Sequence, residues 1–346
     1  MGAAMKDELS FEELVLIMGG HTAFQLLWAG VQLGVFEALS ETPGMSKEDI
    51  GVKTNLESRP LRILLTGLTA LRMIIKEGTS YRNSGVVEKM LVSKSPENWV
   101  EVLGWQNYIV YPGEMDFVES LKQNSNVGLR RFPGNENNLY ARLSHDPFLE
   151  KTFQDSMSSL STSANTYLAD QVDLSGVKHL VDAGGGDGTN AIRLARANPH
   201  LKVTIFDAPT VCERAEKNIG QAGLVGRVDT HPGDFFVRDF PAGIDCILFA
   251  HMLTIWSPEK DTALLRRAYE ALPSGGQVII FNMMGWDDET GPMTTALGSP
   301  YFLSIATGEG MLYTWKELES FLSAAGFRQA KRLELPKDHG VLIGIK

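Results

Sequence analysis

The chain has little cysteine, no excess of positive charge and no long apolar run, and each absence excludes a class of protein. Cys212 and Cys246 are the two cysteines among 346 residues and lie in separate segments, so neither a disulfide framework nor a zinc site is expected. The formal net charge of -10 leaves no electrostatic footprint for nucleic acid or an anionic membrane. Apolar stretches such as ELVLIM are interrupted within a few residues, far short of the ~20 residues that span a bilayer.

The N-terminal residues lack a targeting signal. The stretch MGAAMKDELSFEEL has no basic region followed by an apolar core, and Lys6 stands where a myristoylation signal needs Ser or Thr. With 43% apolar residues, the chain is able to bury a core in each of two domains. We therefore expect a cytoplasmic protein without membrane contact.

What the chain does have is a glycine-rich turn between a strand and a helix, LVDAGGGDGTNAIRLA, at residues 180–195. Gly184 permits the tight turn out of the strand, Gly186 lets a ligand approach the backbone, and Gly188 lets the helix pack on the strand. Asp207 ends the next strand, LKVTIFD, where a carboxylate is able to accept both hydroxyls of a ribose. These features, in this order, predict a nucleotide-binding site.

The charge of the turn indicates which nucleotide is bound. The turn lacks the Lys-Ser/Thr pair of a triphosphate-binding loop, and its carboxylates Asp182 and Asp187 repel a pyrophosphate but attract a cationic ligand with an amino-acid end. S-adenosylmethionine has that charge. In the later HPGDFF, Asp234 is placed to accept from the adenine amino group and Phe235 to stack on the ring. The structural alternative is an ordinary βα turn with a helix-capping Asp207 and a core Phe235.

With these motifs and others along nearly its whole length, the sequence resembles the small-molecule methyltransferases of plant caffeate and flavonoid type and their bacterial natural-product relatives. The other matching segments are LGVFEAL, LLTGLTALRMI, FQDSM, LPSGGQVII and YTWKELESFLSAAGF. The resemblance implies a Rossmann-like α/β domain that binds S-adenosylmethionine, with Ser161 at the position for the methionine carboxylate. It also implies that Phe153 and Met157 form part of the wall of the acceptor pocket.

Residues 1–100 are predicted to form a winged-helix-like dimerisation domain. Apolar residues recur at helical spacing from Ser10 to about Leu39, with more apolar surface than a small domain covers, so a homodimer is favoured over packing onto the second domain. Two further helices follow, the second over residues 58–71, and then a hairpin that turns at Gly78. The second of these helices is mostly apolar, which argues against its reading a DNA groove.

The remaining sequence is predicted to form two further parts. Residues 101–170 are mainly helical and rich in large aromatic side chains, and in the resembling family this segment roofs the acceptor cavity. Residues 171–346 alternate strands and helices, which predicts a doubly wound α/β sheet that ends in two strands, AKRLEL and HGVLIGI.

The segment after the fourth strand, FAHMLTIWSPEK, lacks the base that the resemblance implies. In the resembling O-methyltransferases this position reads like L-H-D-W, and the histidine takes the proton of the acceptor phenol. Here Thr254 and Ile255 replace the His-Asp pair, whereas Trp256 is retained. Asn282 and Leu312 stand where two acids usually orient the histidine. The three expected catalytic positions therefore carry side chains that do not titrate near neutral pH.

A general base contributes roughly 10²- to 10⁴-fold to a proton-transfer step, so its absence leaves three explanations. The acceptor is a nitrogen or an electron-rich carbon, for which positioning against the methyl group is the main requirement. Alternatively, His251 is a substitute base, which would share a face with Thr254 if the segment is helical. A structural role as a partly buried histidine is equally well supported for His251. In the third explanation, the enzyme transfers no methyl group: it holds the cofactor as a fixed charge and catalyses a rearrangement, cyclisation or decarboxylation.

The sequence as a whole predicts a dimeric S-adenosylmethionine-dependent methyltransferase that acts on carbon or nitrogen of an aromatic or polycyclic small molecule. Alternatives are a non-methylating enzyme on the same fold and a protein that senses the cofactor or a metabolite. The acids at 287–289 are typical of a solvated loop, so no metal is expected. The predicted cofactor residues are Ser161, Asp182, Gly184, Gly186, Asp207, Asp234, Phe235 and Trp256, the last also facing the acceptor. The predicted acceptor residues are Phe153, Met157, Phe302 and Met311, with His251, Thr254 and Asn282 as catalytic candidates.

Overall fold

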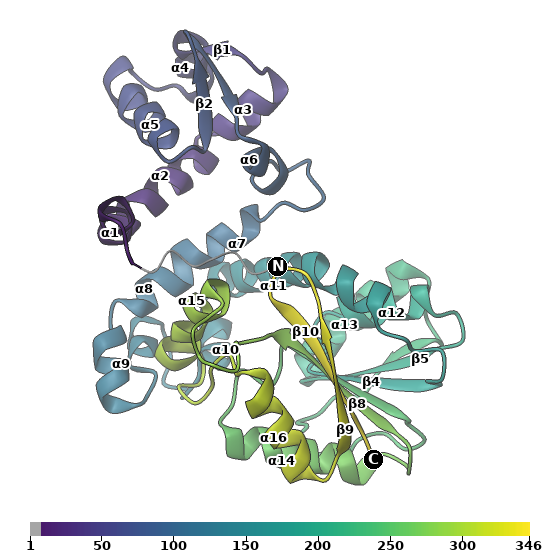
Figure 1. Cartoon of the computed structure of the whole chain (residues 1–346). Coiled ribbons are helices and arrows are strands. Elements are labelled where there is room, and N and C mark those ends of the chain that lie inside the picture. Colours follow the sequence, from purple (N-terminus) through teal and green to yellow (C-terminus); the bar gives the residue numbers. More distant parts are fainter. Residues whose placement is uncertain (1–7) are drawn as a thin grey trace. The chain divides into compact units, whose positions relative to one another are not determined.

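The computed structural model describes residues 8–346, which form parts of two compact units, Met1–Asn107 and Tyr108–Lys346 (Figure 1). The expectations about an N-terminal signal and about Lys6 concern residues 1–7 and lie outside the described residues. The segment 101–170, predicted as a separate part, is divided between the two units at Tyr108. The functional assignment of the three predicted parts stays a prediction.

The first unit is mainly helical and carries a small sheet. Its helices are α1 (Phe11–Met18), α2 (Gly20–Gln32), α3 (Val35–Glu41), α4 (Lys47–Thr54), α5 (Ser58–Ala70), α6 (Gly85–Met90) and α7 (Val100–Trp105). Its strands β1 (Met45–Ser46), β2 (Ile74–Glu77) and β3 (Ser80–Asn83) are arranged in the order β1-β3-β2. The predicted hairpin is present and turns at Gly78, where φ is +61°. Two helices followed by a hairpin therefore occur where the sequence predicted them.

Helix α1 presents an apolar surface that its own unit leaves exposed. All eight of its residues are exposed, among them Phe11 (74%), Ile17 (68%) and Met18 (71%). Exposed apolar patches of this kind mark interaction sites in soluble proteins. In residues 8–346 no single helix is both long and apolar enough to cross a membrane, although α1 and α2, bent by 68°, pass the length and composition test as a pair.

The second unit is built on a seven-stranded sheet in the order β6-β5-β4-β7-β8-β10-β9. The strands are β4 (His179–Ala183), β5 (Lys202–Phe206), β6 (Val228–Thr230), β7 (Cys246–Ala250), β8 (Gln277–Met283), β9 (Arg328–Glu334) and β10 (His339–Ile345). The first five are parallel, and β10 is antiparallel to both β8 and β9. The predicted α/β sheet with two C-terminal strands is therefore confirmed. The carboxyl ends of β4, β5, β7 and β8 lie along one edge of this sheet.

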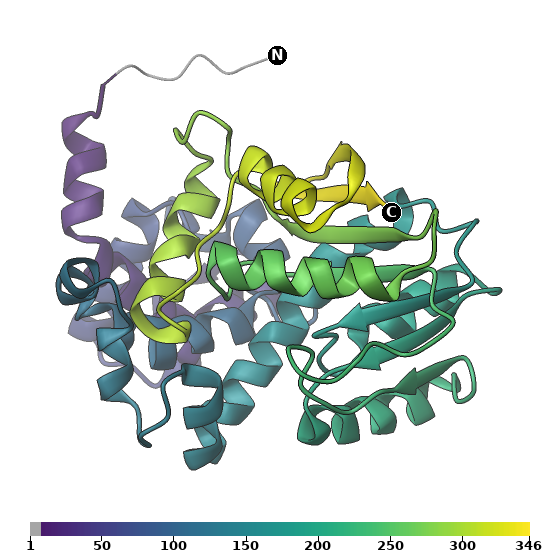
Figure 2. The ribbon, with the colours of Figure 1, turned by 90° about the horizontal axis from the view of Figure 1, so that it is seen from below.

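Helices cover both faces of the sheet. Cores of buried apolar side chains join one face to α14 (Pro258–Ala271) and α16 (Trp315–Ala325), and the other face to α11 (Pro147–Gln171), α12 (Thr189–Ala197) and α13 (Pro209–Ala222). Figure 2 shows α14 and α16 side by side along the sheet. Cysteines 212 and 246 are buried and are not joined in a disulfide.

Short helical segments complete the second unit around the carboxyl edge of the sheet. They are η1 (Gln106–Val110), which begins in the first unit, α8 (Tyr111–Glu114), α9 (Phe117–Gln123), η2 (Val127–Arg131), α10 (Leu139–Arg142), η3 (Leu143–His145), α15 (Met293–Tyr301) and η4 (Phe302–Ala306). Local sequence sets the starts of the long helices. Asp146 Oδ1 accepts from the N–H groups of Phe148 and Leu149 at the start of α11, and Thr314 forms a capping box with Glu317 at the start of α16.

Candidate functional site

Each of Gly184, Gly186 and Gly188, in the turn after β4, requires a glycine for a different structural reason. Gly184 has a φ of +72°, and a Cβ on it would lie 2.3 Å from the sulfur of Met252. Gly188 has a φ of +84°, and a Cβ there would meet the Cδ1 atom of Ile205 at 2.9 Å, so α12 packs closely on β5. At Gly186, whose φ is +58°, an added Cβ would have no atom of the described residues within 4 Å. Gly186 is therefore the position where a ligand has room to approach the backbone.

Asp207 fastens this turn to the end of β5. Its Oδ2 atom accepts the Gly186 N–H at 2.9 Å, and its Oδ1 atom accepts the Ala208 N–H at 2.7 Å. Burial raises the pKa of Asp207 even though both hydrogen bonds act to lower it. The carboxylate is half-buried, and each oxygen keeps a lone pair for a further donor. The Asp207 carboxylate is therefore able to accept hydrogen bonds from both hydroxyls of a ribose.

Asp182 lies beneath the turn rather than on its surface. Its side chain is 0% exposed, and within residues 8–346 neither carboxyl oxygen has a hydrogen-bond partner. A Cβ on Gly185 would be 2.8 Å from the carboxyl carbon of Asp182, which shows how closely the turn covers it. Burial, with the negative charges of Asp207 and Asp187, raises the pKa of Asp182 to about 7. An unpartnered carboxyl in this position suits a cationic ligand, so the residues fit S-adenosylmethionine.

The predicted adenine-binding residues lie next to Asp207. The Gly233 N–H donates to the backbone oxygen of Asp207 at 2.8 Å, which holds the GDFF segment beside the end of β5. Asp234 is exposed, and its Oδ1 atom accepts the Phe236 N–H at 2.9 Å. The ring of Phe235 is half-buried and lies 5.1 Å from that of Phe236. The structure therefore brings Asp207, Asp234 and Phe235 to one edge.

The predicted residues of α11 share one helical face. Phe153, Met157 and Ser161 are spaced by four residues and are all half-buried. The ring of Phe153 lies edge-on to that of Tyr140 on α10, with centroids 5.7 Å apart. The contacts of Met157 and Ser161 with a ligand stay predictions.

At the end of β7, the ring of His251 lies edge-on to two other rings. Its backbone has a φ of +55°, and its N–H donates to the Phe281 oxygen at 2.8 Å. Its ring centroid lies 4.8 Å from that of Phe281 and 5.2 Å from that of His339. Burial, aided by His339, lowers the pKa of His251 to about 3, so the imidazole is neutral at neutral pH.

The sequence placed His251 and Thr254 on one face only if the segment between them is helical. In the structure this segment forms turns rather than a helix. The positive φ of His251 takes the backbone out of the helical region directly after the strand. The two residues are nevertheless linked, since the Thr254 hydroxyl donates to the His251 oxygen at 3.3 Å.

Asn282 is a buried polar side chain without a partner. It lies in β8, is 1% exposed, and neither of its amide atoms has a hydrogen-bond partner in the described part of the chain. Thr254 and Leu312 are also buried, and the Leu312 N–H donates to Ser299 Oγ at 3.1 Å. Unpaired buried amides cost free energy, so Asn282 is a candidate to meet polar groups of a ligand.

The segment after α15 covers the end of β7. The Thr307 hydroxyl donates to the Ile255 oxygen, and the Tyr313 hydroxyl donates to the Trp256 oxygen at 2.8 Å. A Cβ on Gly310 would lie 2.0 Å from the Thr254 oxygen, so the two backbones are in close contact.

The predicted residues Phe302 and Met311 and the acid Glu309 belong to this covering region, whereas the predicted residue Trp256 follows β7 and is contacted by it. Phe302 is half-buried in η4, Met311 is 43% exposed, and the indole of Trp256 lies 5.4 Å from the Lys260 nitrogen. Glu309, which lies between two glycines, forms an ion pair with Lys260 at 2.7 Å.

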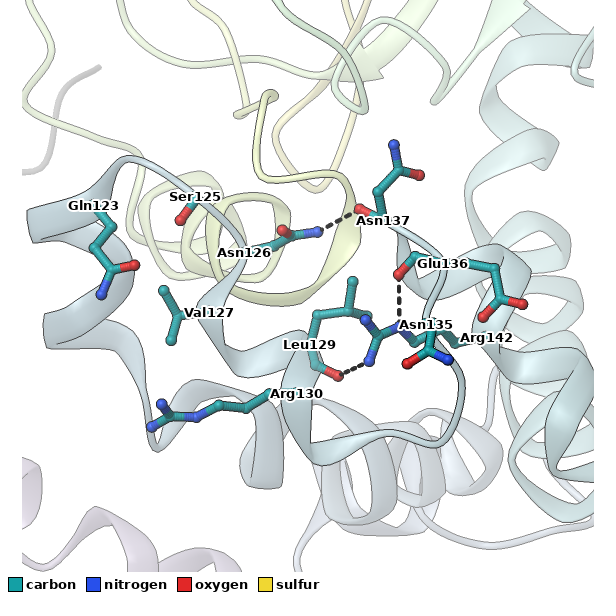
Figure 3. A pocket seen from close by; sticks show the side chains of 10 residues that line it. All are labelled: Gln123, Ser125, Asn126, Val127, Leu129, Arg130, Asn135, Glu136, Asn137 and Arg142. Atoms are coloured by element: carbon teal, nitrogen blue, oxygen red, sulfur yellow. Dashed lines mark hydrogen bonds between the residues drawn. The ribbon is translucent and has the colours of Figure 1, made fainter.

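Two hollows of the second unit are lined by other residues. One, of about 370 Å³, has a polar lining from the ends of α9, η2 and α10 (Figure 3). Arg142 donates there to the backbone oxygens of Glu136 and Leu129, and Asn126 donates to that of Asn137, so the lining is held by structural hydrogen bonds. The other, of about 820 Å³, lies among α11, α12 and α13. Of the described residues that line them, none is a predicted acceptor residue.

Comparison with known proteins agrees with this geometry. Residues 119–328 match the family model of an O-methyltransferase domain. The chain is 43% identical to the L-tyrosine C(3)-methyltransferase of Streptomyces lavendulae, over 99% of this chain and 94% of that protein. It is 32% identical to the 3-hydroxy-5-methyl-1-naphthoate 3-O-methyltransferase of Streptomyces sahachiroi, over 93% and 91% of the two chains. The crystal structure of the S-adenosylmethionine-dependent methyltransferase SibL, without ligand, has a TM-score of 0.86 and 40% identity over 97% of this chain and 99% of that one.

The family model spans more than half of the chain, and the relatives align with almost all of it. The glycine turn, Asp207 and the unpartnered Asp182 fit the requirements of S-adenosylmethionine. The chain therefore belongs to the O-methyltransferase family and is an S-adenosylmethionine-dependent methyltransferase.

Proposed function

We propose that the protein methylates a ring carbon of a phenolic natural-product precursor of the tyrosine type. One observation carries this proposal. Neither the three expected catalytic positions nor His251, at the ends of β7 and β8, supplies a base strong enough to take the proton of a phenol. Thr254, Asn282 and Leu312 do not titrate near neutral pH, and the pKa of His251 is lowered to about 3. A phenol has a pKa of about 10, so proton transfer to His251 is strongly uphill.

Methylation at carbon places a different demand on the protein. The bound cofactor supplies an electrophilic methyl group on its sulfonium. The ring carbon is itself the nucleophile, and the ring that has gained a substituent is cationic and loses its proton readily, so a weak base is sufficient. Neutral His251 is able to accept that proton. The residues around the acceptor then act mainly by positioning it.

The relatives support carbon as the acceptor atom without deciding it. The relative at 43% identity is named for methylation of tyrosine at C3, whereas the one at 32% identity is named for methylation of a naphthoate oxygen. One fold therefore serves both kinds of acceptor, and the residues at the site select between them. In this proposal Phe153, Met157 and Phe302 form the apolar wall, and Asn282 meets a polar group of the acceptor.

Isotope labelling tests the proposal directly. The protein is incubated with L-tyrosine and S-adenosylmethionine that carries a deuterated methyl group, and the product is analysed by mass spectrometry and proton NMR. We expect the label on the product and the loss of one aromatic proton signal next to the hydroxyl. Label on oxygen or nitrogen, with all ring protons retained, would contradict carbon methylation. Conversion without label would indicate the non-methylating alternative.

We also propose that the protein is a homodimer that pairs through its winged-helix-like first unit. The support is the exposed apolar surface of α1, which an identical surface on a second copy would cover in a symmetric contact.

A further inference from the structure

We propose that Tyr140, supported by Tyr301, binds the phenolic oxygen of the acceptor and so turns the neighbouring ring carbon, rather than that oxygen, toward the methyl group. The inference rests on the proposed function. Neither tyrosine was assigned a role by the sequence motifs.

The two tyrosines lie between two of the predicted acceptor residues. Tyr140 is a half-buried residue of α10, and its ring lies edge-on to Phe153 with centroids 5.7 Å apart. Tyr301 is the buried last residue of α15, and its ring lies 5.2 Å from that of Phe302. Their hydroxyl groups interact with each other. A pair of hydroxyls therefore stands within an aromatic wall that is otherwise apolar.

The chain around Tyr301 is anchored beside the end of β7, where the acceptor is expected. η4 continues directly from Tyr301, and Thr307, just after it, donates to the Ile255 oxygen. One turn before Tyr301, a Cβ on Gly298 would meet the side chain of Leu312 at 2.8 Å. α10, which carries Tyr140, packs against η4. Both hydroxyls are thus held on segments that cover the carboxyl edge of the sheet.

Tyr140 remains a hydrogen-bond donor at working pH. Its side chain is half-buried, and a phenolic hydroxyl is able both to donate and to accept a hydrogen bond. The interaction with Tyr301 acts to lower the pKa of Tyr140 and to raise that of Tyr301. Burial raises the pKa of Tyr140 to about 12, which keeps it a neutral donor at every working pH.

A donor at this point selects between oxygen and carbon. The oxygen of a phenol and the adjacent ring carbon are two bonds apart, so a small rotation of the ring decides which one faces the methyl group. A hydrogen bond from Tyr140 to the oxygen holds it against the protein and leaves the carbon free. It removes no proton from the acceptor, which agrees with the lack of a matched base.

A binding cycle tests the contact without turnover. Calorimetry measures the affinity of L-tyrosine and of L-phenylalanine, which differs by the hydroxyl, for the wild type and for Tyr140→Phe. We expect the wild type to favour L-tyrosine by about 2- to 10-fold, as one hydrogen bond contributes, and Tyr140→Phe to bind the two ligands equally. If Tyr140 has a purely structural role, Tyr140→Phe should lower the affinity for both ligands equally. The same preference in wild type and variant, or no binding of L-tyrosine, would overturn the proposal.

Product analysis gives an independent second reading. Tyr140→Phe should release O-methylated product beside the C-methylated one, and Tyr301→Phe should shift the ratio in the same direction by a smaller amount. Tyr269→Phe is the matched control, because this half-buried tyrosine of α14 packs against Phe327, with centroids 5.2 Å apart, in another part of the second unit. Unchanged product ratios in both Tyr140→Phe and Tyr301→Phe would refute the assignment.

The two readings separate this proposal from the proposed function. If wild type forms no C-methylated product, the proposed function fails, while the binding cycle still reports whether Tyr140 contacts the hydroxyl. If Tyr140→Phe does not fold, as judged by thermal unfolding, the Tyr301→Phe product ratio and its binding cycle decide the question.

Discussion

At the scale of single residues, Gly184 and Gly186 show why one glycine-rich turn makes two kinds of demand. Both have positive φ, but a Cβ on Gly184 would collide with Met252, whereas one on Gly186 would point into open space. The first glycine is required by packing within the protein. The second is required only by the backbone conformation and by whatever approaches from outside.

Alanine substitutions should separate these demands. We expect Gly184→Ala to lower the free energy of unfolding by more than the 1–2 kcal/mol that a left-handed conformation costs, because Met252 must also move. Gly186→Ala should cost about that conformational amount and weaken S-adenosylmethionine binding more strongly. Denaturant unfolding and calorimetry measure the two quantities. Wild-type affinity in Gly186→Ala would show that no ligand approaches this position.

The residues after β7 lead to a prediction about catalysis. Because Thr254 is buried and does not titrate, Thr254→Ala should reduce kcat/KM by less than the ~10²-fold that loss of a general base costs. His251 has a pKa of about 3, so its neutral form is fully present above pH 5. Asp182, with a pKa of about 7, titrates between pH 5 and 8 and His251 does not, so His251→Ala should leave the inflections of the kcat/KM profile in this range unchanged. A large loss in His251→Ala that recovers at high pH would instead identify His251 as the base of an O-methyltransferase.

At the scale of elements, α14 carries a buried acid whose titration should affect the stability of the whole unit. Asp261 lies in the first turn of α14, is 0% exposed, and finds no hydrogen-bond partner for either oxygen among the described residues. Burial, with the charge of Glu309, raises the pKa of Asp261 to about 8. A helix start favours an acidic side chain, but this one faces the core rather than water.

The pH dependence of stability should reveal this acid. Between about pH 4 and 8 the folded state holds a proton on Asp261 that the unfolded state has lost, so the contribution of Asp261 to the free energy of unfolding falls as pH rises through this window. The stability of Asp261→Asn relative to wild type should increase by up to about 1.4 kcal/mol per pH unit there. Denaturant unfolding at a series of pH values measures the difference. Glu259→Gln, at an exposed position in the same turn, is the control and should lack this rise.

At the scale of the whole molecule, the sequence and the first unit together indicate self-association. The eight exposed residues of α1 include Leu14, Val15, Leu16, Ile17 and Met18, in an unbroken apolar run. Water contact with such a run is costly, at about 25 cal/mol for each Å² of apolar surface, so a second copy gains free energy by covering it.

Light scattering should show a dimer at micromolar concentration. The double variant Ile17→Glu and Met18→Glu should be monomeric, because charges at these positions would be buried without partners in the contact. Val52→Glu replaces an exposed residue of α4 outside this run and should leave the dimer intact. A monomeric wild type would remove the basis of the proposed dimer.

Local sequence was sufficient to predict the main strands and helices and the glycine turn that Asp207 fastens. The strands from β4 to β8 were evident because their apolar runs are short and end at turn residues, and the glycine turn with Asp207 depends on spacing along the chain. The helix-helix-hairpin of the first unit followed from periodicity and the turn at Gly78 in the same way. These features are local, so neighbouring residues determine them.

Only the tertiary structure decided the environment of the individual side chains. His251 was an open candidate in the sequence, and the burial of its ring beside Phe281 and His339, which lie on other strands, depresses its pKa. Tyr140 and Tyr301 are far apart in the chain, and no spacing rule joins them. Burial and charge act through space, so pKa values and hydrogen-bond partners depend on residues distant in sequence, whereas the identity of the fold depends on the local pattern of apolar and turn residues.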